Sequence, residues 1–241
     1  MSKVVLITNV RHYVGPAATA RLAADGARVM CHDASFADEA ARTAWSQAHP
    51  GVAAAAAQEP AALVAETLAL HGGLDALVSN DEFPAIRAPL EAARLDDLRA
   101  GLEAMVVRPF ALAQAAVPQL KRQGAGRIVL ITSAAPLRGL PNYGMYATAR
   151  GAANALTLTL AKELAPHGIT VNAVAPNYVE NPSYFPPELI ANAEAMAKML
   201  RNIPLGRLGK PEEVAALIAF LCLGDCAFVT GHVVPVAGGW A

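Results

Sequence analysis

Short apolar runs alternate with longer segments of helical periodicity along the whole chain. A weak apolar run near Val52–Ala57 predicts a marginal β-strand. Stronger runs, bounded by turn residues and too short for helices, predict further strands at Val4–Thr8, Arg28–His32, Leu74–Ser79, Arg127–Thr132, Thr170–Ala175 and Val233–Val236.

The segments between these strands predict helices, several of which have proline at or near the first turn, where its missing N–H costs little. They are Pro16–Asp25, Asp38–Ala48, Pro60–His71, Asp96–Arg122, Tyr143–His167 and Pro211–Leu223. Alternation of this kind implies right-handed crossovers and a parallel sheet covered on both faces. We therefore predict the α/β class, with residues 1–241 forming a single doubly wound Rossmann-like domain of about seven strands.

One long irregular stretch interrupts the alternation, at about residues 176–210. Its prolines and aromatic residues, as in "NPSYFPPELI", suggest a loop plus a short helix. In doubly wound folds ligands bind outside the carboxyl ends of the strands, so we expect this segment to lie over that edge of the sheet.

Composition narrows the possible functions. Of 241 residues 54% are hydrophobic and 16% are charged, which excludes a disordered chain. The formal net charge of -1 gives no electrostatic case for binding nucleic acid or an anionic membrane. No uninterrupted apolar stretch reaches the ~18 residues of a membrane span, and the first residues lack the features of a signal peptide.

Cysteine and histidine usage points away from disulfides and metals. Cys31, Cys222 and Cys226 are too few for a disulfide framework, suit a reducing cytoplasm, and are expected as free thiols in a core. No histidine has ligand partners at metal spacing, so we expect no metal site and a cytoplasmic protein.

The stretch "RIVLITSAAPLRGLPNYGMYATAR", residues 127–150, carries the candidate chemistry. Ser133 falls at the end of a predicted strand, Tyr146 opens the next helix, and Arg150 lies one turn further along the same face. An unperturbed phenol titrates near ~10, and an adjacent guanidinium favours the phenolate. Tyr146 is thus a candidate general base, with Ser133 holding the substrate oxygen. The alternative is a structural or surface Tyr–Arg contact.

These residues resemble the short-chain dehydrogenases and reductases, in which a serine precedes a Tyr-x-x-x-Lys helix. Ser133 and Tyr146 match that pattern, and Arg150 stands in place of the lysine. Other family segments are "LVSND", "ITVNAVAP", "PLGRLGKPEEVAALIAFL" and "VTGHVVPVAGG", so the resemblance covers the chain from end to end.

The family's first turn, Thr-Gly-x-x-x-Gly-x-Gly, is altered. Asn9 replaces the first glycine, Tyr13 replaces the second, and Gly15 keeps the third. A side chain at the second position collides with an approaching dinucleotide, so this turn is expected to hold no phosphate.

Other cofactor positions are altered too. Ser79, Asn80, Asp81 and Glu82 stand where the family has Asn-Asn-Ala-Gly. The family's Pro-Gly-x-x-x-Thr segment also keeps only its proline. Asp33, at the end of the second strand, either binds a cofactor ribose or accepts backbone N–H groups in the following turn. With the glycine turn blocked, the second role is favoured, and no cofactor is expected.

Within that family the chain resembles the halohydrin dehalogenases, which have a Ser-Tyr-Arg triad and Tyr-x-x-x-Arg spacing. The stretches "TNVRHY", "CHDASF", "VSND", "RPFAL" and "APNY" are similar to theirs. The resemblance implies catalysis by Ser133, Tyr146 and Arg150. It also implies a halide site in place of the nicotinamide pocket, formed by Tyr13, Pro176, Asn177, Tyr178 and Val179. Tyr184 and Phe185 either complete this pocket or merely pack the loop.

The implied reaction has no redox step: a vicinal haloalcohol becomes an epoxide, a halide ion and a proton. The expected partners are therefore a small haloalcohol or epoxide and a small anion. Two apolar helix faces, with the resemblance, predict a homotetramer. Some relatives extend beyond the final "GG" into a neighbouring subunit, a contact not expected here, where Trp240 and Ala241 follow. The alternatives are an NAD(P)-dependent short-chain oxidoreductase and a catalytically idle binding domain.

Overall fold

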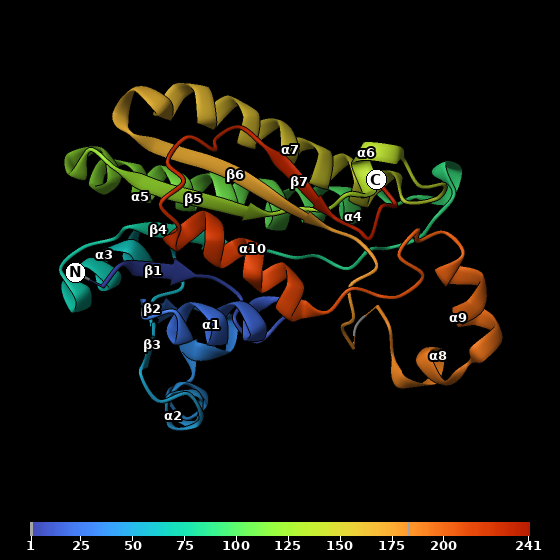
Figure 1. Ribbon diagram of the computed structural model, residues 1–241, viewed down its shortest axis with the longest axis horizontal. Helices are drawn as coiled ribbons and strands as arrows, with labels where there is room; N and C mark the ends of the chain where they lie inside the picture. Colours follow the sequence, from blue (N-terminus) through green and yellow to red (C-terminus); the bar gives the residue numbers. More distant parts are fainter. Residues whose placement is uncertain (1, 183) are drawn as a thin grey trace.

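Every predicted strand is present, and all of them pair in parallel within one sheet. The computed structural model describes residues 2–182 and 184–241. The strands are β1 Val4–Ile7, β2 Arg28–Cys31, β3 Val52–Ala54, β4 Ala76–Ser79, β5 Gly126–Ile131, β6 Ile169–Pro176 and β7 Val233–Val236. Their order across the sheet is β3-β2-β1-β4-β5-β6-β7 (Figure 1). The chain order reverses between β1 and β4, which opens a crevice at their carboxyl ends.

Helices cover both faces of this sheet. On one face α1 packs against α10, and on the other α3 packs against α5 and α4 against α7 (Figure 1). The helices are α1 Gly15–Ala24, α2 Glu39–Ala48, α3 Pro60–His71, α4 Leu95–Leu102, α5 Arg108–Gln123, α6 Ala135–Arg138, α7 Gly144–Leu164, α8 Pro187–Ala191, α9 Ala193–Leu200 and α10 Pro211–Leu223, with short 3₁₀ turns at η1 Ala34–Ala37, η2 Leu90–Ala92 and η4 Ala165–His167. The predicted doubly wound fold is confirmed.

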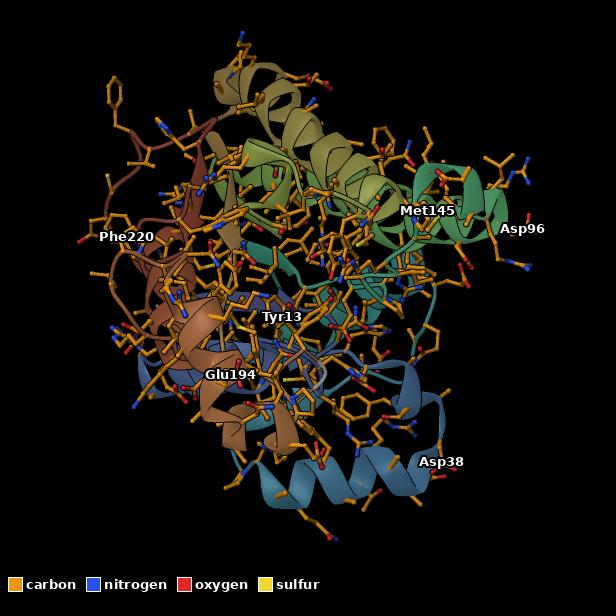
Figure 2. All side chains as sticks on the ribbon, turned by 90° about the vertical axis from the view of Figure 1, so that its right-hand side faces the viewer. Tyr13, Asp38, Asp96, Met145, Glu194 and Phe220 are labelled. Carbon is orange, nitrogen blue, oxygen red and sulfur yellow. The ribbon has the colours of Figure 1, made fainter. Side chains whose placement is uncertain are left out.

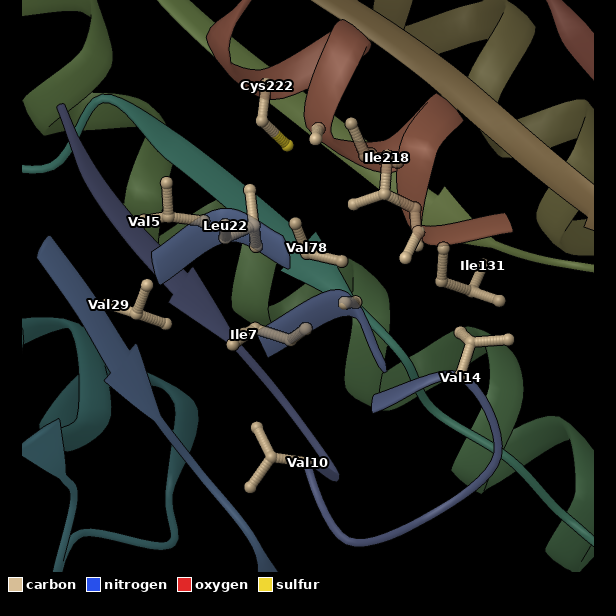
Figure 3. Packing of buried hydrophobic residues seen from close by; sticks show 14 of the residues in the cluster. Val5, Ile7, Val10, Val14, Leu22, Val29, Val78, Ile131, Ile218 and Cys222 are labelled. Atoms are coloured by element: carbon tan, nitrogen blue, oxygen red, sulfur yellow. The ribbon is translucent and has the colours of Figure 1, made fainter. Parts of the chain in front are cut away.

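The core forms two layers because successive strand side chains point to opposite faces. Val5 and Ile7 pack with Leu22 of α1 and Ile218 of α10 in one layer (Figure 3). Leu6, between them in the sequence, packs in the other layer under α3 and α5. Burial on both faces explains why the strands read as continuous apolar runs.

The predicted helix Asp96–Arg122 is not a single α-helix. A π-helical segment, η3 Glu103–Val107, separates α4 from α5. Pro109 follows directly and has no N–H to donate to the preceding turn, so regular α-helical bonding cannot continue through this point.

The segment at 176–210 lies beyond the carboxyl ends of the strands as expected, but it contains two short helices and not one (Figure 1). Asn192 ends α8 in an extended conformation, and its side chain accepts the N–H of Ala195, which starts α9 as a new helix. Ser183, within this segment, lies outside the described residues.

One further expectation needs correction. Cys226 is exposed beyond the end of α10, so only Cys31 and Cys222 are buried thiols.

The helical stretch Leu95–Gln123, which includes the π-helical segment, is long and apolar enough, by length and composition alone, to cross a membrane. The apolar runs of the sequence did not show it because charged residues interrupt them. Part of this stretch packs against α3 and the sheet, and 33% of its most apolar window is buried.

Candidate active site

A cavity of about 330 Å³ opens at the carboxyl edge of the sheet, beside the segment that carries α8 and α9. Every predicted site residue except Arg150 lines it. The lining consists of Tyr13, Ala85, Ser133, Ala135, Leu140, Tyr143, Tyr146, Pro176, Asn177, Tyr178, Val179, Asn181, Tyr184, Phe185 and Met199. Among these described residues none is charged, and aromatic and apolar side chains alternate with a few polar groups, as in many small-molecule sites. In Figure 2 Tyr13 lies between α9, which carries Glu194, and the start of α7, which carries Met145.

Arg150 lies directly behind the cavity wall and is 2% exposed. Its Nη1 donates to the backbone oxygens of Ile131 at 2.8 Å and Asp81 at 3.0 Å. Its Nε donates to the Tyr146 hydroxyl at 3.3 Å. Burial disfavours the cation, but the nearby phenols of Tyr146, Tyr184 and Tyr13 together outweigh burial, so the pKa of Arg150 is raised above its ordinary value. A permanent positive charge is therefore held against one phenol.

This geometry excludes a surface Tyr–Arg contact. Tyr146 and Arg150 are one turn apart on α7, and the guanidinium carbon lies 5.4 Å from the centroid of the Tyr146 ring. The buried guanidinium has acceptors from β5 and from the segment after β4, so three separate elements fix its position. Fixed geometry of this kind is what an acid–base pair requires.

Two other phenols, Tyr13 and Tyr184, share the cavity with Tyr146. Their rings pack edge to face with centroids 6.2 Å apart. Burial and the neighbouring Tyr146 raise the pKa of both side chains. They remain protonated at neutral pH and can act as O–H donors, whereas Tyr146 is the phenol that contacts the cation.

Ser133 follows β5 and is 4% exposed. Its Oγ accepts the N–H of Ala135 at 3.1 Å, at the start of α6. Since that bond uses a lone pair, the hydroxyl proton stays available to donate to another oxygen in the cavity.

The first turn keeps the backbone of a glycine-rich turn without its glycines. Asn9 has φ 49° and Tyr13 has φ 50°, both in the left-handed region that favours glycine. At Gly15 a Cβ atom would lie 2.5 Å from the Asn9 oxygen, so this glycine is needed for packing α1 onto the turn. Side chains thus project from the turn at the two positions where the family has none.

One of these side chains builds a buried polar network that the sequence did not reveal. Asn9 Nδ2 donates to Asp81 Oδ1 at 2.9 Å, and the Ser79 hydroxyl donates to the other carboxylate oxygen. Arg108 Nε lies 3.7 Å from the same carboxylate. Burial raises the pKa of Asp81 in spite of these partners. In the sequence, the only sign was that polar residues replace Asn-Asn-Ala-Gly next to the altered turn.

Asp33 has the structural role that the sequence favoured. Its Oδ1 accepts the Ser35 N–H at 3.0 Å and the Ser35 hydroxyl at 2.7 Å. Its Oδ2 accepts the Arg11 N–H at 3.3 Å and lies 3.6 Å from His12 Nε2. Both carboxylate oxygens are thus engaged within the protein.

The loop after β6 forms the opposite wall. Asn177 Oδ1 accepts the Tyr178 N–H at 3.0 Å, while Asn177 Nδ2 is buried with no hydrogen-bond partner among the described residues. An unpaired amide donor at a cavity is suited to an anion or another acceptor. Tyr184 and Phe185 line the cavity and also pack the loop, and their role in a halide site stays a prediction.

A doubly wound parallel sheet with a serine, a tyrosine and a buried cation at its carboxyl edge is the arrangement of a Rossmann-like enzyme. Residues 11–241 match the family model described as enoyl-(acyl carrier protein) reductase. The human "Dehydrogenase/reductase SDR family member 4" is 32% identical over 248 residues, covering 99% of this chain and 87% of that protein. The chain belongs to the short-chain dehydrogenase/reductase family.

Two solved structures have a higher sequence identity to this chain than that relative. A protein described as "Dehalogenation enzyme" is 53% identical, with a TM-score of 0.96 and coverage of 100% of this chain and 98% of that one. A halohydrin dehalogenase bound to ethyl (2S)-oxiran-2-ylacetate is 37% identical, with a TM-score of 0.94 and coverage of 98% and 96%.

Proposed function

We propose that this protein is a halohydrin dehalogenase, which converts vicinal haloalcohols reversibly to epoxides without a nicotinamide cofactor. One observation carries the proposal: the Tyr13 side chain lines the same cavity as Ser133 and Tyr146. In a nicotinamide-dependent relative, that side of the cavity must be open to the dinucleotide at the first turn. The two similar dehalogenase structures support the same function.

The residues at the dinucleotide position do not fit a dinucleotide. Tyr13 projects from the first turn, and the carboxylate of Asp33 is occupied by Ser35 and Arg11. His12, in the same turn, lies 3.3 Å from Glu82. An oxidoreductase of the family is the second candidate, supported by the Ser–Tyr pair that both classes share and by the reductase family model and the dehydrogenase/reductase relative.

In the proposed reaction Tyr146 as phenolate removes the hydroxyl proton of the haloalcohol. Ser133 keeps its proton and donates a hydrogen bond from its free hydroxyl to the same substrate oxygen. The alkoxide attacks the neighbouring carbon, the new C–O bond closes the epoxide, and the C–halogen bond breaks with its electrons leaving on the halide. Arg150 stabilises the phenolate at the start of each cycle. In reverse, protonated Tyr146 gives its proton to the opening epoxide oxygen.

The departing halide needs stabilisation in a cavity that offers no cation in its described lining. Asn177 Nδ2, from the loop after β6, and the hydroxyls of Tyr13 and Tyr184 are hydrogen-bond donors among the residues that line the cavity. Ring edges add a weaker positive potential. Such a site favours large, weakly hydrated anions such as bromide over fluoride, whose desolvation costs far more.

Incubating the protein with a vicinal bromoalcohol, while following free bromide and pH, tests the proposal. We expect stoichiometric bromide and acid without added nucleotide, and no bromide release from Tyr146→Phe. NADH and NADPH titrations by calorimetry should show no saturable binding. A protein that releases no bromide but oxidises or reduces a substrate with NADP(H) is a conventional family member, and the proposal is then wrong.

We also propose a homotetramer. Val107, Phe110 and Leu158 are large apolar residues that are about half exposed on η3, α5 and α7. Light scattering after size exclusion tests this, since a monomer near 25.0 kDa would contradict it.

A further inference from the structure

Tyr178 stands between two cavities. The first is the candidate active site, and the second, also of about 330 Å³, lies behind the loop after β6. The second cavity is lined by Leu205 and Arg207, before α10, and by residues from the end of β7 to Gly239. Among the described lining residues, Asn177 and Tyr178 are shared by both. The Tyr178 ring is therefore part of the wall that separates them.

The backbone of Tyr178 is fixed in a strained conformation. Its φ is 55°, which is unfavourable for a residue with a side chain. Its carbonyl accepts the Gly209 N–H at 2.9 Å, and the preceding Asn177 N–H donates to Val236 at 3.1 Å. These bonds hold the main chain from two sides, and they leave the direction of the ring to side-chain contacts.

Trp240 provides the main aromatic contact of that ring. The two rings pack edge to face with centroids 5.8 Å apart and an interplanar angle of 75°, within the favourable range for aromatic pairs. Trp240 is 6% exposed and packs with Ala134, beside Ser133, and with Ala175 near the end of β6. It therefore touches both segments that flank the candidate active site.

Arg138 in turn holds Trp240. Its guanidinium carbon lies 5.0 Å from the centroid of the Trp240 ring, close enough for a cation–π contact. Its Nη1 donates to the Trp240 carbonyl at 2.6 Å. Arg138 is exposed, so it can be changed without opening a hole in the core.

We infer that Trp240 is a positioning residue that keeps the Tyr178 ring as the closed wall of the anion pocket, with Arg138 fixing Trp240. Without the tryptophan the Tyr178 ring can turn into the second cavity, which joins the two spaces and admits water to the anion. The identity of the anion as halide rests on the proposed function. Among the described residues, Tyr146 and Arg150 share no hydrogen bond or aromatic pair with Trp240, so their acid–base behaviour is expected to stay unchanged.

Added bromide should inhibit bromide release competitively, and its inhibition constant measures the affinity of the pocket for the anion. An edge-to-face pair is worth a factor of about two to ten in binding, so Trp240→Leu should raise the bromide inhibition constant by that factor. Trp240→Phe should restore most of the lost bromide affinity. The inhibition constant of Arg138→Ala should lie between those of Trp240→Phe and Trp240→Leu. The pH–rate profile should be the same in all three variants, which a general loss of structure would not produce.

The sequence offers a matched control, because it has only one other tryptophan, Trp45. It lies on α2, beside β3 at the opposite edge of the sheet from β7. Trp45→Leu removes the same buried ring and should leave the inhibition constant unchanged. Trp45→Phe leaves Trp240 as the sole indole, and its emission should then change saturably with bromide, with a midpoint that Arg138→Ala shifts upward.

The outcomes separate the two proposals. If wild-type protein releases no bromide, the proposed function fails. The emission titration needs no turnover, so it still tests whether Trp240 holds the Tyr178 ring as the wall of the pocket. If bromide is released normally while Trp240→Leu and Arg138→Ala leave both the inhibition constant and the midpoint unchanged, the inference about Trp240 is wrong. An emission change that is linear in bromide, as for collisional quenching, also overturns it.

Discussion

Replacing Arg150 by lysine tests whether the site depends on the guanidinium fork and not on charge alone. Arginine spans three acceptors: the Tyr146 hydroxyl and the backbone oxygens of Ile131 and Asp81. A lysine ammonium is a single point on a flexible stem and cannot reach all three from the same helix position. At 2% exposure, water does not easily replace the lost bonds.

The expected magnitude follows from those bonds. If lysine keeps one of the three, two charge-assisted hydrogen bonds disappear, each worth ~1.5–3 kcal/mol. The lower end, about 3 kcal/mol, is expected because local rearrangement recovers part of the loss. For a domain of this size that corresponds to a fall in Tm of roughly 6–12 °C. Loss of the fixed position of the cation beside the phenol should slow bromide release by about 10²-fold or more.

Scanning fluorimetry and initial rates of bromide release measure both effects. Arg99→Lys is the matched control, because Arg99 is a surface residue whose contact is an exposed ion pair with Asp96; neither Tm nor rate should change. An Arg150→Lys variant that keeps its Tm within about 2 °C and its rate within about twofold would contradict this expectation, since charge alone would then suffice.

Three further changes have defined outcomes. Ser133→Ala removes one donor to the substrate oxygen and should reduce bromide release about 10²-fold, with exposed Ser46→Ala unchanged. Tyr13→Ala should weaken inhibition by bromide without moving the pH–rate profile; an unaltered inhibition constant would make Tyr13 a cavity filler. Glu213→Gln tests a carboxyl whose pKa the Arg207 hydrogen bonds lower to about 2. A lowered pKa gives stability that is present above the ordinary value of 4.5 and is lost as pH falls toward 2. The pair is half-exposed, so the Tm difference at pH 7 should stay below about 4 °C and shrink in acid.

Much of the fold is readable in the chain because it depends on local periodicity. Strands buried on both faces, such as Val4–Ile7, must be continuously apolar, and the crossover helices between them need their own apolar stripe. The Tyr146–Arg150 contact is equally local, since residues four apart on a helix share one face. The altered first turn is also visible directly, because a tyrosine in place of a turn glycine needs no coordinates to be noticed.

Other features depend on which distant segments meet, and local pattern carries no information about that. Burial of Arg150 requires the end of β5 and the segment after β4 to present carbonyl oxygens to α7. The Asn9–Asp81 bond joins residues 72 positions apart. Trp240 meets Tyr178 only because β7 lies beside β6 in the sheet. Each contact is set by the convergence of strand ends at one edge, a property of the packed sheet that no single segment possesses.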